Sequence, residues 1–287
     1  MFLWIILALV VAIFGIIGFS YIFARSTLRA PLRPRENNPK TGLPLQPIEV
    51  QGQAGILRGW FISHGSKKPA ILLTHGWGRN AAQMIPFAEF LFAKGYNLCL
   101  YDVRGHGNSD PDKDGLVIMP RFAEDIISMA KYCCGRADVD PARLGHLGHS
   151  MGAASSFFAE RRGKLFRCMI ASSGFADLRD LMSWMLKTVR LPSFPFQKLI
   201  IFFWQRTSHY TFTDLNPVSI LPSLHLPVLI AHGDKDVVVP FSQFDKLKAH
   251  ATNGNVQAVF VSGKGHSELY TDAKYVSAVQ EFFAKHL

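Results

Sequence analysis

The sequence has few cysteines, and none of the four falls in a metal-binding pattern. Cys99 and Cys168 lie in apolar segments typical of strands, where a thiol behaves as a small hydrophobe. Cys133 and Cys134 are neighbours, and adjacent cysteines rarely suit disulfide geometry. The sequence also lacks the Cys-x-x-Cys and His-x-x-x-His spacings of zinc sites. We therefore expect no metal and no cofactor, and the thiols agree with a reducing compartment.

The sequence also lacks a dense run of basic residues, although its formal net charge is +10. Residues 25–45 hold five basic residues and one acidic residue, a net charge of +4. The remaining charge is spread thinly along the chain, unlike the clustered cations that contact phosphate backbones. We therefore expect no nucleic-acid partner.

Charge is missing altogether from residues 1–24, which form a long apolar run. At 1.5 Å per helical residue, roughly 22 residues reach about 33 Å, enough to cross a hydrocarbon core of about 30 Å. The run therefore predicts a transmembrane helix over residues 1–24. A cleaved signal peptide is the alternative, but it normally carries basic residues before a shorter apolar core, and none precedes Phe2.

The segment that follows, residues 25–45, is basic and rich in proline, with Pro31, Pro34, Pro39 and Pro44. Proline biases the residue before it away from the α region, so we expect an extended linker. Basic residues flanking a membrane span are retained on the cytoplasmic side. We therefore expect a single-pass membrane protein whose larger part, residues 46–287, is cytoplasmic.

Residues 46–287 alternate between strand-like and helix-like segments. Strands are expected near residues 48–51, 57–63, 70–74, 97–101, 143–147, 167–172, 228–231 and 256–261. Such alternation predicts a mostly parallel, doubly wound α/β sheet of about eight strands flanked by helices, and about 240 residues suit one domain. Residues 176–221 exceed what one crossover needs, so we expect a small helical cap there.

Ser150 is the centre of the pentapeptide Gly148-His149-Ser150-Met151-Gly152, between a predicted strand and a predicted helix. At a sharp strand-to-helix elbow, glycines on both sides let neighbouring backbone pass without a Cβ clash. The serine hydroxyl then projects from the end of the sheet. The motif alone is weak evidence in a chain with 23 glycines, so its meaning depends on other loops.

Two later loops supply partners for Ser150 in the order serine, acid, histidine. Asp236 follows the strand at residues 228–231, and His266 follows the strand at residues 256–261. Asp234 lies on the same short loop as Asp236 and is the alternative acid. Because the carboxyl ends of parallel strands share one edge of the sheet, we expect these side chains to meet there.

An oxyanion hole is expected beside this trio. Its donors would be the backbone N–H groups of Met151, directly after the nucleophile, and Trp77, after the strand at residues 70–74. His75, His106 and His149 also lie near the site. We expect them to form hydrogen bonds and shape loops rather than act as bases.

These motifs resemble the α/β-hydrolase superfamily over about residues 46–287. Residues 101–109, Tyr-Asp-Val-Arg-Gly-His-Gly-Asn-Ser, are similar to its Arg-Gly-x-Gly-x-Ser loop. Residues 232–240 are similar to its acid loop, in which the second aspartate, here Asp236, belongs to the triad. The resemblance implies acyl transfer through an acyl-enzyme on Ser150, with His266 as general base and Asp236 orienting it.

Several functions share this triad. We expect a carboxylesterase or lipase-like serine hydrolase acting on a small-molecule ester or a lipid-like substrate, because the cap region is rich in large apolar side chains. The alternatives are a serine peptidase or aminopeptidase-like enzyme, a thioesterase, and a non-catalytic membrane-tethered binding protein. Dehalogenase and epoxide hydrolase chemistry is disfavoured, because those relatives carry aspartate at the elbow.

Overall fold

A single eight-stranded sheet organises the chain, with strand order β1-β2-β4-β3-β5-β6-β7-β8. The computed structural model describes residues 1–30 and 39–287, without the side chain of Asp214. The strands are β1 Gln46–Gln51, β2 Ile56–Ile62, β3 Lys68–Thr74, β4 Asn97–Tyr101, β5 Val139–His149, β6 Cys168–Ser172, β7 Val228–Gly233 and β8 Val256–Val261. β2 pairs antiparallel with β1 and β4, and the other neighbours are parallel. The predicted mostly parallel sheet is confirmed.

Helices cover both faces of the sheet, because alternate residues of each buried strand point to opposite sides. In β3, Leu72 joins the apolar core under α3 (Met119–Cys134) and α4 (Met151–Gly163). Its neighbours Ile71 and Leu73 join the core under α2 (Ile85–Phe92) and α9 (Ala273–His286). The remaining domain helix, α8 (Ser242–Ala249), follows β7 and packs with the first core.

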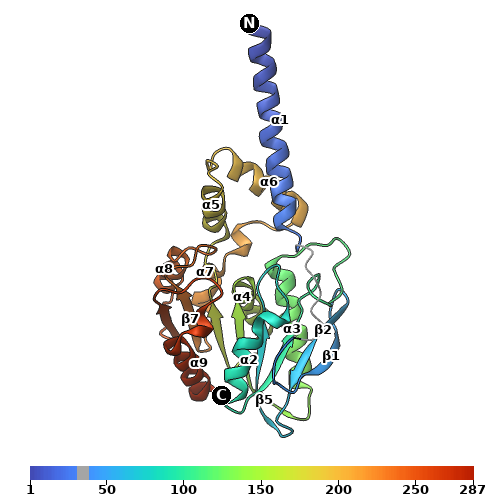
Figure 1. Cartoon of the computed structure of the whole chain (residues 1–287), viewed down its shortest axis with the longest axis vertical. Coiled ribbons are helices and arrows are strands. Elements are labelled where there is room, and N and C mark those ends of the chain that lie inside the picture. Colours follow the sequence, from blue (N-terminus) through green and yellow to red (C-terminus); the bar gives the residue numbers. More distant parts are fainter. Residues whose placement is uncertain (31–38) are drawn as a thin grey trace.

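The region predicted as a cap, residues 176–221, contains α5 (Leu178–Thr188), α6 (Phe196–Ser208) and the short α7 (Pro217–Ile220). Asp177 caps α5 by accepting hydrogen bonds from the backbone of Arg179 and Asp180. In Figure 1, α5 and α6 lie above the sheet, and α6 lies next to α1.

The N-terminal apolar segment forms one helix, α1 (Phe2–Thr27), which projects from the rest of the molecule (Figure 1). By length and composition this helix could cross a membrane, and a signal sequence would pass the same test. It ends at Thr27 instead of the predicted Ala24. The hydroxyls of Ser26 and Thr27 donate to the Phe23 carbonyl one turn back, so the polar residues continue the helix.

The expected linker, residues 25–45, is therefore helical in its first residues. Its prolines Pro31 and Pro34 and its arginines Arg33 and Arg35 lie outside the described residues. Pro39 and Pro44 lie in irregular backbone before β1.

Candidate active site

Ser150 occupies a strained elbow between β5 and α4, with φ of 55° and ψ of −116°. A Cβ on Gly148 would lie 2.6 Å from the backbone of Gly152, and a Cβ on Gly152 would lie 2.5 Å from the Thr74 carbonyl oxygen. Both positions therefore require glycine. The Ser150 amide donates to the Ser172 carbonyl of β6 at 2.9 Å, which fixes the elbow to the sheet.

The three residues predicted as a triad lie in one hydrogen-bonded chain. His266 Nε2 is 3.0 Å from Ser150 Oγ, and His266 Nδ1 is 2.7 Å from Asp236 Oδ2. An ionised carboxylate can only accept hydrogen bonds, so Nδ1 carries the proton and Nε2 presents its lone pair to the serine hydroxyl. This arrangement is the one in which histidine can remove the serine proton.

Asp236 is held by four donors. Its Oδ1 accepts from the amides of Val238 and Val239 at 2.9 and 2.8 Å, and its Oδ2 also lies 3.2 Å from His232 Nε2. Burial acts to raise the pKa of Asp236, but the hydrogen bonds from His232 and His266 outweigh it and hold that pKa well below its usual range. The carboxylate therefore stays ionised throughout the neutral pH range.

His232 is a member of this cluster to which the sequence analysis gave no role. Besides Asp236, its Nε2 lies 2.9 Å from the Val239 carbonyl oxygen. Both neighbours are acceptors, so Nε2 carries a proton and the ring clamps the acid loop. The available signal was position, because His232 is the next-to-last residue of β7 and lies four residues before Asp236.

Asp234, the alternative acid, connects different groups. Its Oδ1 accepts from the Gly263 amide at 2.6 Å, and its Oδ2 accepts from Ser262 Oγ at 3.2 Å. These bonds join the loops after β7 and β8. Asp234 thus aligns the two loops, while Asp236 is the carboxylate that contacts His266.

The two expected oxyanion donors lie beside the nucleophile. Trp77 and Met151 line the same cavity as Ser150 and His266. Neither amide donates to an acceptor in the described part of the chain, and the N-terminus of α4 adds its positive dipole end there. A Cβ on Gly76 would lie 3.0 Å from Ser150 Cβ, so the loop of Trp77 presses closely on the elbow.

His75 and His106 shape this loop, as expected. His106 Nε2 accepts from the Gly78 amide at 2.9 Å, and His75 Nε2 accepts from the Val103 amide at 3.0 Å. Burial lowers the pKa of His75 to about 4 and that of His106 to about 3. Both rings therefore stay neutral and keep their role as acceptors.

His149 differs from the expectation of a hydrogen-bonding role. Neither of its ring nitrogens has a partner among the described residues. The ring is buried, with its centroid 4.9 Å from that of His266. Burial, followed by the nearby His266, lowers the pKa of His149 well below its usual range. His149 thus packs as a neutral ring against the back of His266.

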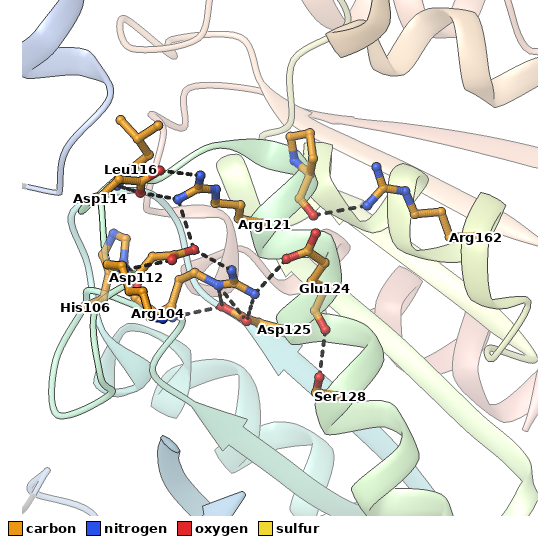
Figure 2. A network of polar contacts seen from close by, with 12 residues as sticks. Arg104, His106, Asp112, Asp114, Leu116, Arg121, Glu124, Asp125, Ser128 and Arg162 are labelled. Atoms are coloured by element: carbon orange, nitrogen blue, oxygen red, sulfur yellow. Dashed lines mark hydrogen bonds and ion pairs between the residues drawn. The ribbon is translucent and has the colours of Figure 1, made fainter. Parts of the chain in front are cut away.

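A buried arginine fixes the loop between β4 and α3 (Figure 2). Arg104 contacts Asp125 of α3 at 2.6 Å, Asp112 at 2.9 Å and Glu124 at 3.0 Å. Arg104 belongs to the Arg-Gly-x-Gly-x-Ser loop, and its ion pairs hold that loop against α3. Three residues at the junction of this loop with α3 line the active-site cavity: Val117, Ile118 and Met119.

The cavity at Ser150 has a volume of about 320 Å³, within the range of small-molecule sites. Apolar side chains from α4, α5, α6 and the preceding loops form most of its wall. They include Met151, Phe175, Leu178, Leu181, Met182, Met185, Trp204, Val238 and Val239. The wall of the cavity at Ser150 is therefore mainly apolar.

Two relatives with similar sequences are uncharacterized bacterial proteins. One from Mycobacterium tuberculosis is 28% identical over 246 residues, which cover 83% of this chain and 79% of the relative. YfhR of Salmonella typhimurium is 28% identical over 249 residues, which cover 80% of this chain and 76% of YfhR.

Solved structures share the fold. The Pyrococcus furiosus esterase Pf2001 matches with a TM-score of 0.72 at 21% identity, covering 90% of this chain and 98% of the esterase. Est1E from Butyrivibrio proteoclasticus, solved with ferulic acid bound, matches with a TM-score of 0.65 at 18% identity, covering 83% and 98%. The resemblance to the α/β hydrolases is therefore confirmed as a fold.

A family model matches residues 87–287, more than half of the chain, and describes the prolyl oligopeptidase family. The matched segment contains the elbow, the acid loop and the histidine loop. That family and the α/β-hydrolase fold together support serine hydrolase activity. The chain belongs to the prolyl oligopeptidase family of α/β hydrolases.

Proposed function

We propose that the chain is a membrane-anchored serine hydrolase that cleaves a carboxylic ester with an apolar acyl part. The observation that carries this proposal is the hydrogen-bonded chain from Asp236 through His266 to Ser150. Ser150 and His266 line a cavity whose wall is mainly apolar. A serine with an aligned base and an acidic partner is an activated nucleophile.

In this mechanism Ser150 Oγ attacks the ester carbonyl while His266 Nε2 takes its proton. Asp236 stabilises the resulting imidazolium, and the amides of Trp77 and Met151 receive the oxyanion. The carbon–oxygen bond to the alcohol then breaks, and His266 returns the proton to the departing alcohol. Water next attacks the acyl-enzyme with His266 again as base, releasing the acid and restoring Ser150.

The apolar lining of the cavity at Ser150 supports the proposal that the acyl part of the substrate is apolar. Leu181, Met182 and Trp204 supply large apolar surface from α5 and α6. Burying an alkyl chain against such surface is worth about 0.8 kcal/mol per methylene. A medium-chain ester should therefore be turned over better than a short, water-soluble one, and the opposite order would refute this part of the proposal.

A serine peptidase is the second candidate, because the family contains prolyl oligopeptidase. A peptidase would use the same triad on an amide. Arg79 lines the cavity and could pair with a peptide carboxylate. Comparing esters, thioesters and aminoacyl amides of the same acyl group separates these activities, since only a peptidase should turn over the amide at a comparable rate.

The proposal also includes a membrane topology: α1 anchors the chain, and residues 46–287 lie on the cytoplasmic side. Arg25 and Arg29 follow the apolar stretch, and cytoplasmic retention of basic residues favours this orientation. Anchoring by α1 also agrees with the packing of its last turns against the domain, where Ala24 is fully buried.

Fluorophosphonate labelling of the full-length chain in detergent tests the nucleophile. Wild type should be labelled, and Ser150→Ala should not. Ser155→Ala is a matched control, because Ser155 is buried in α4, the helix that begins after Ser150, and its hydroxyl has no partner among the described residues. Failure of folded wild type to label would refute catalysis and favour the non-catalytic binding protein.

A further inference from the structure

The last turns of α1 are built into the catalytic domain. Ser20, Ala24 and Leu28, which are spaced by four residues, are fully buried. Residues at this spacing share one helical face, so the most deeply buried stripe of the helix faces the domain. Directly after the helix, the Leu28 carbonyl accepts from the Val117 amide at 2.7 Å. The end of α1 is thereby joined to the loop that Arg104 fixes.

Helix α6 of the cap lies along α1. Phe19 and Phe196 meet edge to face with ring centroids 5.5 Å apart, and Tyr21 and Phe203 meet at 5.4 Å. Figure 1 shows the two helices side by side, above the sheet. Small residues on α1 at Ser20 and Ala24 permit such close approach. The apolar helix and the cap therefore form one packed unit.

The same part of α1 forms a wall of the active-site cavity. Phe23 and Thr27 line the cavity that contains Ser150 and His266. Trp204 of α6 lines it too. A substrate bound at Ser150 would therefore touch the apolar helix itself. A helix that served only as a tether would make no such contact.

Helix length places this wall at the level of the lipid headgroups. The 26 residues of α1 span about 39 Å, roughly 9 Å more than a hydrocarbon core of about 30 Å. Because charged residues begin at Arg25, the surplus lies at the C-terminal end. Phe23 and Thr27 then lie at the boundary between acyl chains and headgroups.

The cap also presents apolar side chains on its outer surface. Val189, Phe194 and Phe202 are 54%, 70% and 59% exposed. Lys198 stands over the Phe194 ring, with Nζ 5.4 Å from its centroid. Aromatic rings with adjacent lysines are typical of surfaces that dip into a bilayer and pair with anionic headgroups.

We propose that the substrate is a long-chain acyl ester resident in the bilayer, and that its chain enters the cavity at Ser150 along α1. The inference rests on the proposed function and adds a source and a route for the substrate. The cap surface at Val189, Phe194 and Phe202 would hold the mouth of this route in the lipid. Phe23 and Thr27 are then specificity-determining residues for the acyl chain.

The test uses the full chain in phosphatidylcholine vesicles with p-nitrophenyl palmitate and p-nitrophenyl butyrate. The readout is the palmitate-to-butyrate ratio of kcat/KM. Thr27→Trp narrows the route and should lower this ratio at least about tenfold, a factor that a small steric misfit can produce. Ile22→Trp is the matched control, because Ile22 lies on the same turns but is 67% exposed, and the ratio should not change.

Phe23→Leu covers the case in which Thr27→Trp does not fold, and it should raise the ratio because it removes a ring from the same wall. Replacing Val189 and Phe202 together by serine should lower palmitate turnover in vesicles relative to detergent micelles. Unlabelled, inactive wild type would refute the proposed function. Normal butyrate turnover with a ratio that neither Thr27→Trp nor Phe23→Leu changes would overturn only the present inference.

Discussion

Replacing Asp236 by asparagine changes the hydrogen bonding of the triad with little change in volume. The two backbone bonds from Val238 and Val239, at 2.9 and 2.8 Å, need an acceptor, so the asparagine oxygen should stay on that side. Its NH₂ group then faces the N–H groups of His232 and His266. A donor facing His266 favours the wrong tautomer, in which Nε2 carries the proton and cannot accept one from Ser150.

The cost of this substitution can be estimated from the groups that lose their partners. Loss of the correct tautomer in a serine triad lowers kcat by on the order of 10⁴, or about 5 kcal/mol in activation free energy. The side chain of His232, 3.2 Å from Asp236 in the wild type, would also lose an acceptor. His232 Nε2 keeps the Val239 carbonyl as acceptor, so that loss should reduce the free energy of unfolding by only about 0.5–1.5 kcal/mol.

The assay is kcat for p-nitrophenyl butyrate with the full-length chain in detergent, alongside its thermal unfolding. Asp234→Asn is the matched control, because Asp234 bonds to Gly263 and Ser262 and not to His266. It should keep activity within about threefold, as expected for a residue outside the reacting groups. A folded Asp236→Asn variant with more than a tenth of wild-type kcat, or a larger loss in Asp234→Asn, would refute the assignment.

Three further predictions concern stability. Gly152→Ala should lower the free energy of unfolding by at least about 1–3 kcal/mol, the usual cost of overpacking, and reduce fluorophosphonate labelling, because its Cβ would lie 2.5 Å from the Thr74 carbonyl oxygen; wild-type values would contradict the elbow geometry. Arg104→Met should cost about 3–5 kcal/mol by leaving Asp125 buried and unpaired, and adding Asp125→Leu should restore part of this loss in urea unfolding. Unfolded histidine takes up a proton near pH 6.5, whereas burial lowers the pKa of His75 to about 4 and that of His106 to about 3. As the pH falls below 6.5 the unfolded state therefore gains protons first, and the free energy of unfolding should fall by about 1.4 kcal/mol per pH unit for each ring. His106→Asn should reduce this slope.

The topology prediction uses tags at the two ends of the chain. In intact cells a tag after Leu287 should become accessible to protease only when the membrane is permeabilised, and a tag before Met1 should be accessible from outside. The reverse pattern would show that the basic residues after α1 do not determine its orientation.

The strands and the residues of the proposed triad could be predicted because each depends on a short local pattern. The elbow needs two glycines around Ser150, and the acid and histidine loops each follow a β-branched, apolar strand. Parallel pairing then brings the ends of β5, β7 and β8 to one edge, as in all sheets of this type. Local patterns and the parallel pairing of strands were therefore enough to predict that Ser150, Asp236 and His266 lie close together.

Other features could not be predicted because they depend on contacts between distant segments. The clamp that His232 applies to Asp236 requires the fold of the acid loop, since the motif itself assigns His232 no partner. The contacts of Phe19 with Phe196 and of Leu28 with Val117 join segments that each look merely apolar. The helix end at Thr27 likewise depends on hydroxyl bonds to preceding carbonyls, which composition does not reveal.

The apolar composition of α1 conceals two different faces. The mean hydropathy of this helix is typical of a membrane span. However, Ser20 and Ala24 are fully buried against protein, while Ile22 is exposed. Removing α1 would expose this contact and open the wall that Phe23 and Thr27 form at the cavity. A cleaved signal peptide makes no lasting contact with the domain it exports. The packing of α1 therefore supports the proposal that the helix is retained, and its position then affects the shape of the cavity at Ser150.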